Sequence, residues 1–283
     1  YTVRAELSEV DPADSAPGNN TREWVFTSLN PAITLNPNVL QLYRSPSGQP
    51  GEVFNTWAGT VRVENNGFTD LQVSSVTLHG EAASHFTIVQ NEATAAPIPP
   101  LGSASLTLRA SVPYGSARHT VLRVASDDPG QPVAEALLMA IVGAESQLED
   151  SDEDGLMDGI ERYLGSDPMQ ADSTGNGTND LAELSMSLPL DEAMIRLSGS
   201  LDFGAVEIGS SAEGTLRILN LGTSPLQVTA ISYPDGFSGP LLHADLLPGG
   251  GVTNLVVTFS PLAVQDYAGS ILVASDATSG DNA

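Results

Sequence analysis

The sequence predicts an all-β protein in which a small loop and short-helix module joins two antiparallel β-sandwiches. Short alternating runs of Val, Ile, Leu and Thr recur along the chain, and Gly, Pro, Asn and Asp separate them. These runs fall into two long tracts that repeat one another. A strongly acidic segment, residues 145–192, lies between the tracts.

The strand candidates have the length and spacing that are typical of a sandwich. In the first tract they are 59–64, 71–78, 104–110, 119–125 and 134–142. In the second tract, which begins near Ile195, they are 214–219, 226–231, 253–259 and 270–274. We therefore divide the chain into a terminal hairpin, sandwich 1, an acidic module and sandwich 2, at residues 1–30, 31–144, 145–192 and 193–283.

The internal repeat is strongest where one strand ends in Asn-x-Gly and the next restarts with Leu-Gln-Val, at Val61–Val73 and again at Leu216–Val228. Further on, Leu122–Asp127 matches Leu272–Asp276. We expect the Gly after Asn to supply the positive φ of a tight turn. The repeated residues then determine the fold and do not form a binding site.

The motifs of the second copy resemble the immunoglobulin-like (Ig-like) ASH/hydin family. They are Leu201-Asp-Phe-Gly204, Asn220-x-Gly222, Val257-Thr-Phe-Ser-Pro261 and Tyr267-Ala-Gly269. The first copy departs from the family at Ala110-Ser-Val-Pro113, where the family has Val-x-Phe-x-Pro. In bacteria this type of module is common in large surface proteins of the choice-of-anchor D kind. The resemblance therefore implies two Ig-like domains of an extracellular or cell-surface protein.

We expect residues 1–30 to form a separate hairpin. Tyr1–Leu7 and Thr21–Thr27 are two strand candidates around a turn at 14–20. They resemble the last hairpin of CARDB-type bacterial adhesion repeats. An isolated hairpin is marginal in water, so we expect these strands to have a partner.

Charge excludes several functions. The chain has 35 acidic and 10 basic residues, a net charge of −25, and neither Lys nor Cys. Lysine and thiol chemistry, disulfides and thiolate zinc sites are therefore excluded. The acidity disfavours nucleic acid and anionic membranes as partners. The longest apolar run, Ala136–Ala144, is too short to span a bilayer.

The acidic module contains a twelve-residue calcium-loop pattern, D-x-[DN]-x-[DN]-G-x5-E, which Asp150–Glu161 matches throughout. Calcium takes six to eight oxygen ligands, and Gly155 permits the bend that brings them together. A short helical stretch, 160–164, is expected to follow. The predicted ligands are Asp150, Asp152, Asp154, the carbonyl of Leu156, Asp158 directly or through water, and Glu161 with both oxygens.

A second loop, Asp172–Glu183, begins 22 residues later and departs from the pattern at Thr174. Its predicted ligands are Asp172, Thr174, Asn176, Thr178, Asp180 and Glu183. Fewer carboxylates predict weaker binding at this loop than at the first. The pair resembles bacterial thrombospondin type 3 repeats, which implies two calcium ions and a further ligand in Asp167. Magnesium is the weaker alternative, because it prefers fewer carboxylates.

Other functional signals are sparse. The sequence has no G-x-S-x-G elbow, P-loop or dinucleotide fingerprint, and we expect no enzyme activity. The four histidines are scattered, and we expect satisfied or exposed side chains. Trp24 and Trp57 fit either a carbohydrate platform or the core, and the core is the favoured interpretation.

These patterns predict a structural or adhesive segment of a bacterial extracellular protein, in which calcium stiffens the spacer between two sandwiches. Its partners would be a protein, a surface glycan or copies of itself. After Ser275 the chain stops where the last strand of sandwich 2 would begin. The strand is then either cut off or donated by a neighbour in a filament. An accessory region of a secreted hydrolase and a carbohydrate-binding module remain alternatives.

Overall fold

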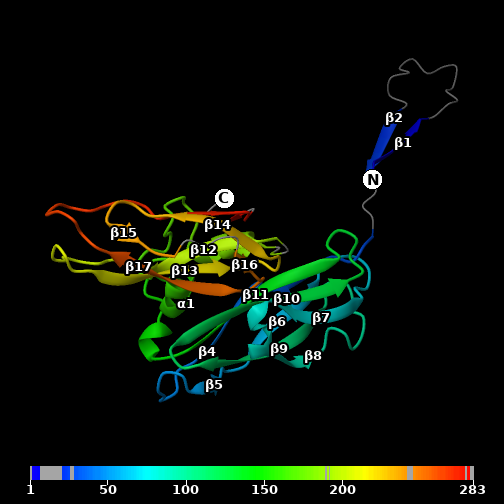
Figure 1. Ribbon diagram of the computed structural model, residues 1–283. Coiled ribbons are helices and arrows are strands. Elements are labelled where there is room, and N and C mark those ends of the chain that lie inside the picture. The colour runs from blue at the N-terminus through cyan, green and yellow to red at the C-terminus, as the bar shows by residue number, and fades with distance from the viewer. Residues whose placement is uncertain are drawn as a thin grey trace.

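The computed structural model describes residues 2–6, 21–25, 29–188, 190, 192–240, 245–277 and 279–280. The protein is mostly β, with several antiparallel sheets in two Ig-like bodies and two short helices between them (Figure 1). Within these ranges no helix is long and apolar enough to cross a membrane.

Sandwich 1 has two facing sheets. One has the order β3-β6-β9-β5, with β8 also paired to β9, and the other has the order β4-β11-β10-β7. A short 3-10 helix, η2 (Glu81–His85), precedes β8. The strands are β3 (Ile33–Asn36), β4 (Val39–Arg44), β5 (Val53–Asn55), β6 (Gly59–Asn65), β7 (Val73–His79), β8 (Phe86–Asn91), β9 (Ser103–Pro113), β10 (Ser116–Ser126) and β11 (Val133–Val142).

Sandwich 2 repeats this plan with shorter strands. Its sheets have the orders β15-β17-β13-β12-β19 and β16-β14-β18. In the described part of the chain β18 pairs with β14 alone, and the two-residue β19 pairs with β12 in parallel. The strands are β12 (Met194–Ser200), β13 (Ala212–Asn220), β14 (Leu226–Ser232), β15 (Phe237–Ser238), β16 (Asp245–Leu247), β17 (Val252–Phe259), β18 (Leu272–Ser275) and β19 (Ser279–Gly280).

The strand predictions are confirmed in both tracts. Each long candidate lies inside an observed strand or overlaps most of it. The terminal hairpin forms as expected, with β1 (Thr2–Glu6) paired to β2 (Thr21–Val25). Among the described residues it forms a two-stranded sheet of its own, so the further partner that we expected is not seen, and Figure 1 draws the hairpin apart from the two bodies. Its predicted turn at 14–20 and the outer ends of both strand candidates lie outside the described residues.

The repeated Asn-x-Gly motif acts through a buried side chain. The amide of Asn220 accepts hydrogen bonds from Met194 N (3.3 Å) and Gly222 N (3.1 Å), and donates to Ser224 O (2.8 Å). In sandwich 1, Asn65 accepts from Ala32 N and Gly67 N and donates to Thr69 O. Each Asn therefore joins the start of the first strand of its sandwich, or the residue just before it, to the turn that follows Asn.

The predicted reason for the glycine is wrong. Neither Gly67 nor Gly222 has a positive φ. A side chain on Gly67 would instead collide with the carbonyl oxygen of Asn30, and one on Gly222 with that of Glu192. Glycine is required here because another backbone segment lies against it.

The two bodies pack directly against each other. Glu81 N donates to Gly249 O (2.7 Å), and Arg123 Nη2 donates to Thr223 Oγ1 (2.9 Å). A hydrophobic cluster contains buried residues of sandwich 1, the acidic module and sandwich 2, among them Leu137, Leu164 and Leu219. The sequence predicted that the acidic module separates the two sandwiches. This is wrong, because the sandwiches contact each other directly and the module lies beside that contact.

The helices of the acidic module lie at this junction. Helix α1 (Asp158–Leu164) contacts β10 and β11 of sandwich 1 and β12 of sandwich 2, as Figure 1 illustrates. Helix α2 (Asp180–Met186) contacts β4. The predicted helical stretch 160–164 lies within α1, and α2 was not predicted.

Candidate metal centre

The first acidic loop folds so that three carboxylates converge. Ligand oxygens of Asp150, Asp152 and Asp154 all lie within 4.8 Å of one another. Backbone amides hold them in place: Gly155 N donates to Asp150 Oδ2 (3.0 Å) and Leu156 N to Asp154 Oδ1 (2.7 Å). Gly155 has a φ of 100°, which is the bend that its place in the pattern predicts.

Glu161 is the most informative residue of this loop. Its side chain is fully buried (0% exposed), and among the described residues neither carboxylate oxygen has a hydrogen-bond partner. Asp152 Oδ2 is also buried and has no hydrogen-bond partner among the described residues. Burial, followed by the nearby charges of Asp152 and Asp154, raises the pKa of Glu161 to about 8. Burial is also the main cause that raises the pKa of Asp152.

A buried polar atom without a partner costs roughly 1–3 kcal/mol, and more when it is charged. Native proteins therefore satisfy nearly all such groups. A calcium ion would supply the missing partner, because it binds carboxylate oxygens and neutralises their mutual repulsion. The residues present thus fit the predicted cation at the first loop.

Asp158, at position nine, closes the loop. Its Oδ1 accepts from Ser151 N (3.0 Å), and its Oδ2 accepts from Ser151 Oγ (3.1 Å) and from Arg162 (3.0 Å). Both oxygens are engaged within the protein. In this arrangement Asp158 ties the start of the loop to the start of α1.

The second loop satisfies its own polar groups. Glu183 Oε1 accepts from Thr174 Oγ1 (2.8 Å) and from Asn176 Nδ2 (2.6 Å), and Arg196 lies 3.8 Å from Glu183 Oε2. Asp180 accepts from both the N–H and the hydroxyl of Ser173, as Asp158 does from Ser151. Here the position-twelve carboxylate has partners that Glu161 lacks.

The remaining predicted ligands occupy local turns. Asp172 accepts from the N–H groups of Gly175 and Gly177, and the latter bond is the main cause of its lowered pKa. Thr178 N donates to Asn176 Oδ1 (2.9 Å). The exposed Asp167 accepts from Gln170 Nε2 (2.6 Å) and from Met169 N (3.1 Å), and these bonds lower its pKa, the one from Gln170 most.

Side chains outside the motif anchor the first loop. Gln41 of β4 donates to Gly155 O (2.7 Å) and accepts from Met157 N (2.9 Å). Leu181 N of α2 donates to Asp154 Oδ2 (3.2 Å), so the second loop's helix touches the first loop's carboxylates. Sequence patterns gave no sign of Gln41, because it lies more than a hundred positions away in the chain.

The other candidate residues have different outcomes. His79, His85 and His119 all have hydrogen-bond partners, as predicted, and His243 lies outside the described residues. The core interpretation is wrong for Trp57, which is 61% exposed beneath the guanidinium of Arg44. Trp24 lies in β2, and its side chain is outside the description.

Comparison with protein families supports the Ig-like assignment for the second body. Residues 193–283 match the family model "HYDIN/CFA65/VesB-like, Ig-like domain". This agrees with the ASH/hydin resemblance of sandwich 2. A comparison with the curated proteins finds no match to this chain.

Several solved structures are similar at low identity. The secreted serine protease VesC from Vibrio cholerae is 14% identical with a TM-score of 0.31, and the match covers 90% of this chain and 52% of VesC. The Escherichia coli chaperone DraB is 9% identical with a TM-score of 0.30, covering 87% and 91%. An ASH/PapD-like domain of human CEP192 is 14% identical with a TM-score of 0.26, covering 42% and 89%. This chain thus spans about half the length of VesC.

Proposed function

We propose that the acidic module binds calcium at the first loop and thereby braces the junction between the two sandwiches. The observation that carries this proposal is Glu161, whose buried carboxylate lies beside converging carboxylates and has no hydrogen-bond partner in the part of the chain that the structure describes. Calcium would convert that unfavourable burial into a closed ligand shell. The ion would then hold Asp150 at the start of the loop to Glu161 on α1.

The brace would act on both bodies because the loop is attached to each of them. Gln41 connects sandwich 1 to the loop backbone. At the other end of α1, Ser198 Oγ of β12 donates to Tyr163 O (3.3 Å). Ordering the loop therefore orders the contacts of α1 with β11 and β12. Extracellular calcium modules bind at roughly 10⁻⁴–10⁻³ M, which suits a structural ion outside the cell.

The proposal is tested by calcium titration, followed by calorimetry and thermal unfolding. The variant Glu161→Gln keeps the side-chain size and removes the charge. Glu153→Gln is the matched control, since Glu153 belongs to the same loop and is exposed. We expect calcium to raise the unfolding temperature of the parent and of Glu153→Gln, and to have little effect on Glu161→Gln. A calcium response that Glu161→Gln leaves intact would refute the proposal.

In the whole protein this region would act as a structural or adhesive segment at the bacterial cell surface, without a catalytic step of its own. Its partner would be a protein or a surface glycan. The main alternative is an accessory role beside a secreted hydrolase. Pull-down of surface glycans or proteins by the parent chain, with and without EGTA, distinguishes an adhesive segment from a passive accessory domain.

Self-association through strand addition is a second candidate function. Strand β10 of sandwich 1 pairs with both β7 and β11. Its counterpart β18 pairs, in the part of the chain that is described, with β14 alone. A donated strand would complete this edge. Sedimentation velocity over a range of concentrations tests the idea, and a strictly monomeric chain would exclude it.

A further inference from the structure

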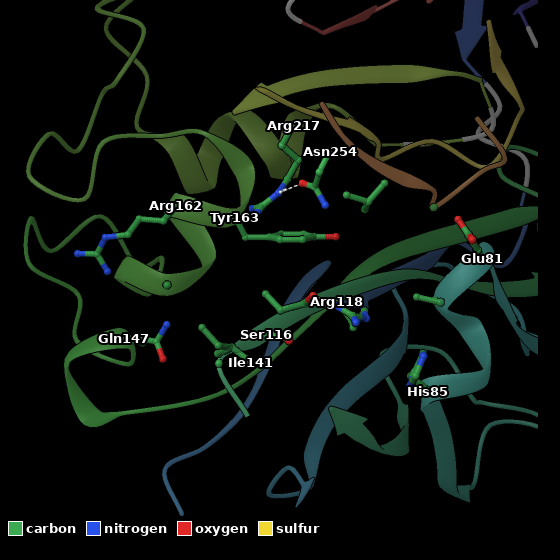
Figure 2. Close-up of a pocket in the computed structure, with 16 residues that line it drawn as sticks. Glu81, His85, Ser116, Arg118, Ile141, Gln147, Arg162, Tyr163, Arg217 and Asn254 are labelled. Carbon is green, nitrogen blue, oxygen red and sulfur yellow. Dashed lines mark hydrogen bonds between the residues drawn. The ribbon is translucent and has the colours of Figure 1, made fainter. Parts of the chain in front are cut away.

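A cleft of about 700 Å³ lies where η2 and β10 of sandwich 1, α1, and β13 and β17 of sandwich 2 meet (Figure 2). None of the predicted calcium ligands is among the residues that line it, although the lining residue Arg162 pairs with Asp158 of the loop. Small-molecule sites in proteins typically enclose roughly 300–1,000 Å³. The cleft is therefore large enough for a ligand of one or two rings.

The charge of this cleft is opposite to that of the molecule. Arg118, Arg162 and Arg217 line it. The whole chain contains only 10 basic residues and has a net charge of −25. Within the described ranges, Glu81 is the one carboxylate that lines the cleft. Three of the few cations therefore gather at one concave surface.

Two of these arginines have no acidic partner in the described part of the chain. Arg118 Nη1 donates to a backbone carbonyl, Ala117 O (2.7 Å), and Arg217 Nε donates to Asn254 Oδ1 (3.1 Å). The Arg217 guanidinium also lies 5.6 Å from the centre of the Tyr163 ring. Arg162 is different, because it pairs with Asp158 at 3.0 Å.

The arrangement of the side chains places these cations around one space. In Figure 2 the Tyr163 ring lies between Arg217 and Arg118, and Glu81 lies toward one end of the cleft. The Arg217 guanidinium is half-buried and held by Asn254 and the ring, so little side-chain entropy remains to be lost on binding. Neutral hydrogen-bonding groups, Ser116 and Gln147, line the same cleft.

We propose that this cleft binds a small acidic sugar, with its carboxylate on Arg118 and its hydroxyls on Arg217 and the neutral polar groups, because the Tyr163 ring separates the two guanidinium groups. Guanidinium groups match planar carboxylates, and such charge-assisted hydrogen bonds are the stronger kind. Hydroxyl groups of the ligand find donors and acceptors in Ser116, Gln147 and Asn254. Glu81 at one end would repel a second negative charge, which favours a ligand with a single carboxylate.

The site would also depend on the packing of the two bodies. Arg118 belongs to sandwich 1, and Arg217 belongs to sandwich 2. Neither body alone carries both cations. The ligand would therefore bind across the junction, and its binding does not require that the acidic loop hold calcium.

The test uses the full chain and D-glucuronate, with D-glucose and acetate as comparison ligands, in 0.15 M NaCl. Salt at this level screens the long-range repulsion between the anion and the acidic surface, because the Debye length is about 8 Å. We expect glucuronate to bind, measured by calorimetry or ligand-observed NMR. Glucose and acetate should each bind at least tenfold more weakly.

The variants Arg118→Gln and Arg217→Gln should each weaken glucuronate binding at least tenfold. Arg44→Gln is the control, because Arg44 lies over Trp57 and away from the cleft. Arg118→Gln is the decisive variant if Arg217→Gln loses stability through Tyr163. Absence of glucuronate binding, equal binding of glucose or of acetate, or binding that Arg118→Gln leaves unchanged would overturn the proposal.

Discussion

His119 Nδ1 lies 2.8 Å from the hydroxyl of Tyr163, and its Nε2 lies 3.2 Å from the carbonyl oxygen of Asn220. This ring joins three parts of the chain: sandwich 1, helix α1 and sandwich 2. Because a carbonyl only accepts, Nε2 carries the proton and Nδ1 accepts from the Tyr163 hydroxyl. The buried imidazole is therefore neutral and has both of its nitrogens satisfied.

The first prediction is that acid weakens the junction through His119. Burial lowers the pKa of His119 to about 4, whereas an unfolded histidine has a value near 6.5. Between these values the unfolded chain binds a proton that the folded chain does not, so stability falls as pH decreases from 6.5 to 4. The loss from this one group is roughly 3 kcal/mol.

Urea unfolding at a series of pH values in EGTA measures this effect. The parent is compared with His119→Gln, so that carboxylates titrating in the same range cancel. We expect the pH slope of the parent to be steeper than that of the variant between pH 6.5 and 4. Identical slopes would show that His119 is not the group responsible.

The second prediction concerns the other half of this hydrogen bond. Tyr163→Phe removes the hydroxyl and leaves His119 Nδ1 buried without its donor. An unsatisfied buried acceptor costs about 1–3 kcal/mol, and we expect a loss of unfolding free energy in that range. Tyr43→Phe is the control, since Tyr43 is 43% exposed, and it should change stability by less than about 0.5 kcal/mol.

The third prediction is that the two loops differ in calcium affinity. Among the described residues the Glu161 carboxylate has no hydrogen-bond partner, whereas the Glu183 carboxylate accepts hydrogen bonds from Thr174 and Asn176. Calcium would have to displace those two hydrogen bonds in order to bind Glu183. Glu161→Gln should remove the tighter phase of a calcium titration, and Glu183→Gln should affect only the weaker phase. Equal affinity at the two loops, or tighter binding at the second, would contradict this ranking.

The fourth prediction is that the two repeated asparagines are structural. Asn220→Ala removes hydrogen bonds to at least three backbone groups, two of them buried, and we expect a loss of about 3 kcal/mol or more. Asn65→Ala should cause a similar loss of unfolding free energy through sandwich 1. Among the described residues, the side chain of the neighbouring Asn66 bonds only the exposed Thr34 hydroxyl, so Asn66→Ala should cost well under 1 kcal/mol by thermal or urea unfolding.

The sequence predicted the strands and the first metal loop because both depend on local patterns. Period-two alternation located β6 and β13, and fixed spacing located the converging carboxylates of Asp150, Asp152 and Asp154. The cleft and the role of His119 could not be predicted in this way, since the residues that they bring together lie far apart in the sequence.

The junction between the sandwiches did leave one sign in the sequence. Strand β11 is apolar on both faces, which is unusual for a strand with a solvated side. Its outer residues Leu137, Met139 and Ile141 pack in the junction cluster.

This junction gives the last prediction, which concerns shape. The hydrogen bonds from His119 to Asn220 and from Arg123 to Thr223 join the sandwiches without passing through the acidic loop. Chelation should therefore lower the unfolding temperature and leave the radius of gyration in small-angle scattering nearly unchanged. Leu221→Asp places a charge in the buried junction cluster and should expand the particle even with calcium present. A large expansion of the parent in EGTA would instead mean that calcium alone holds the two bodies together.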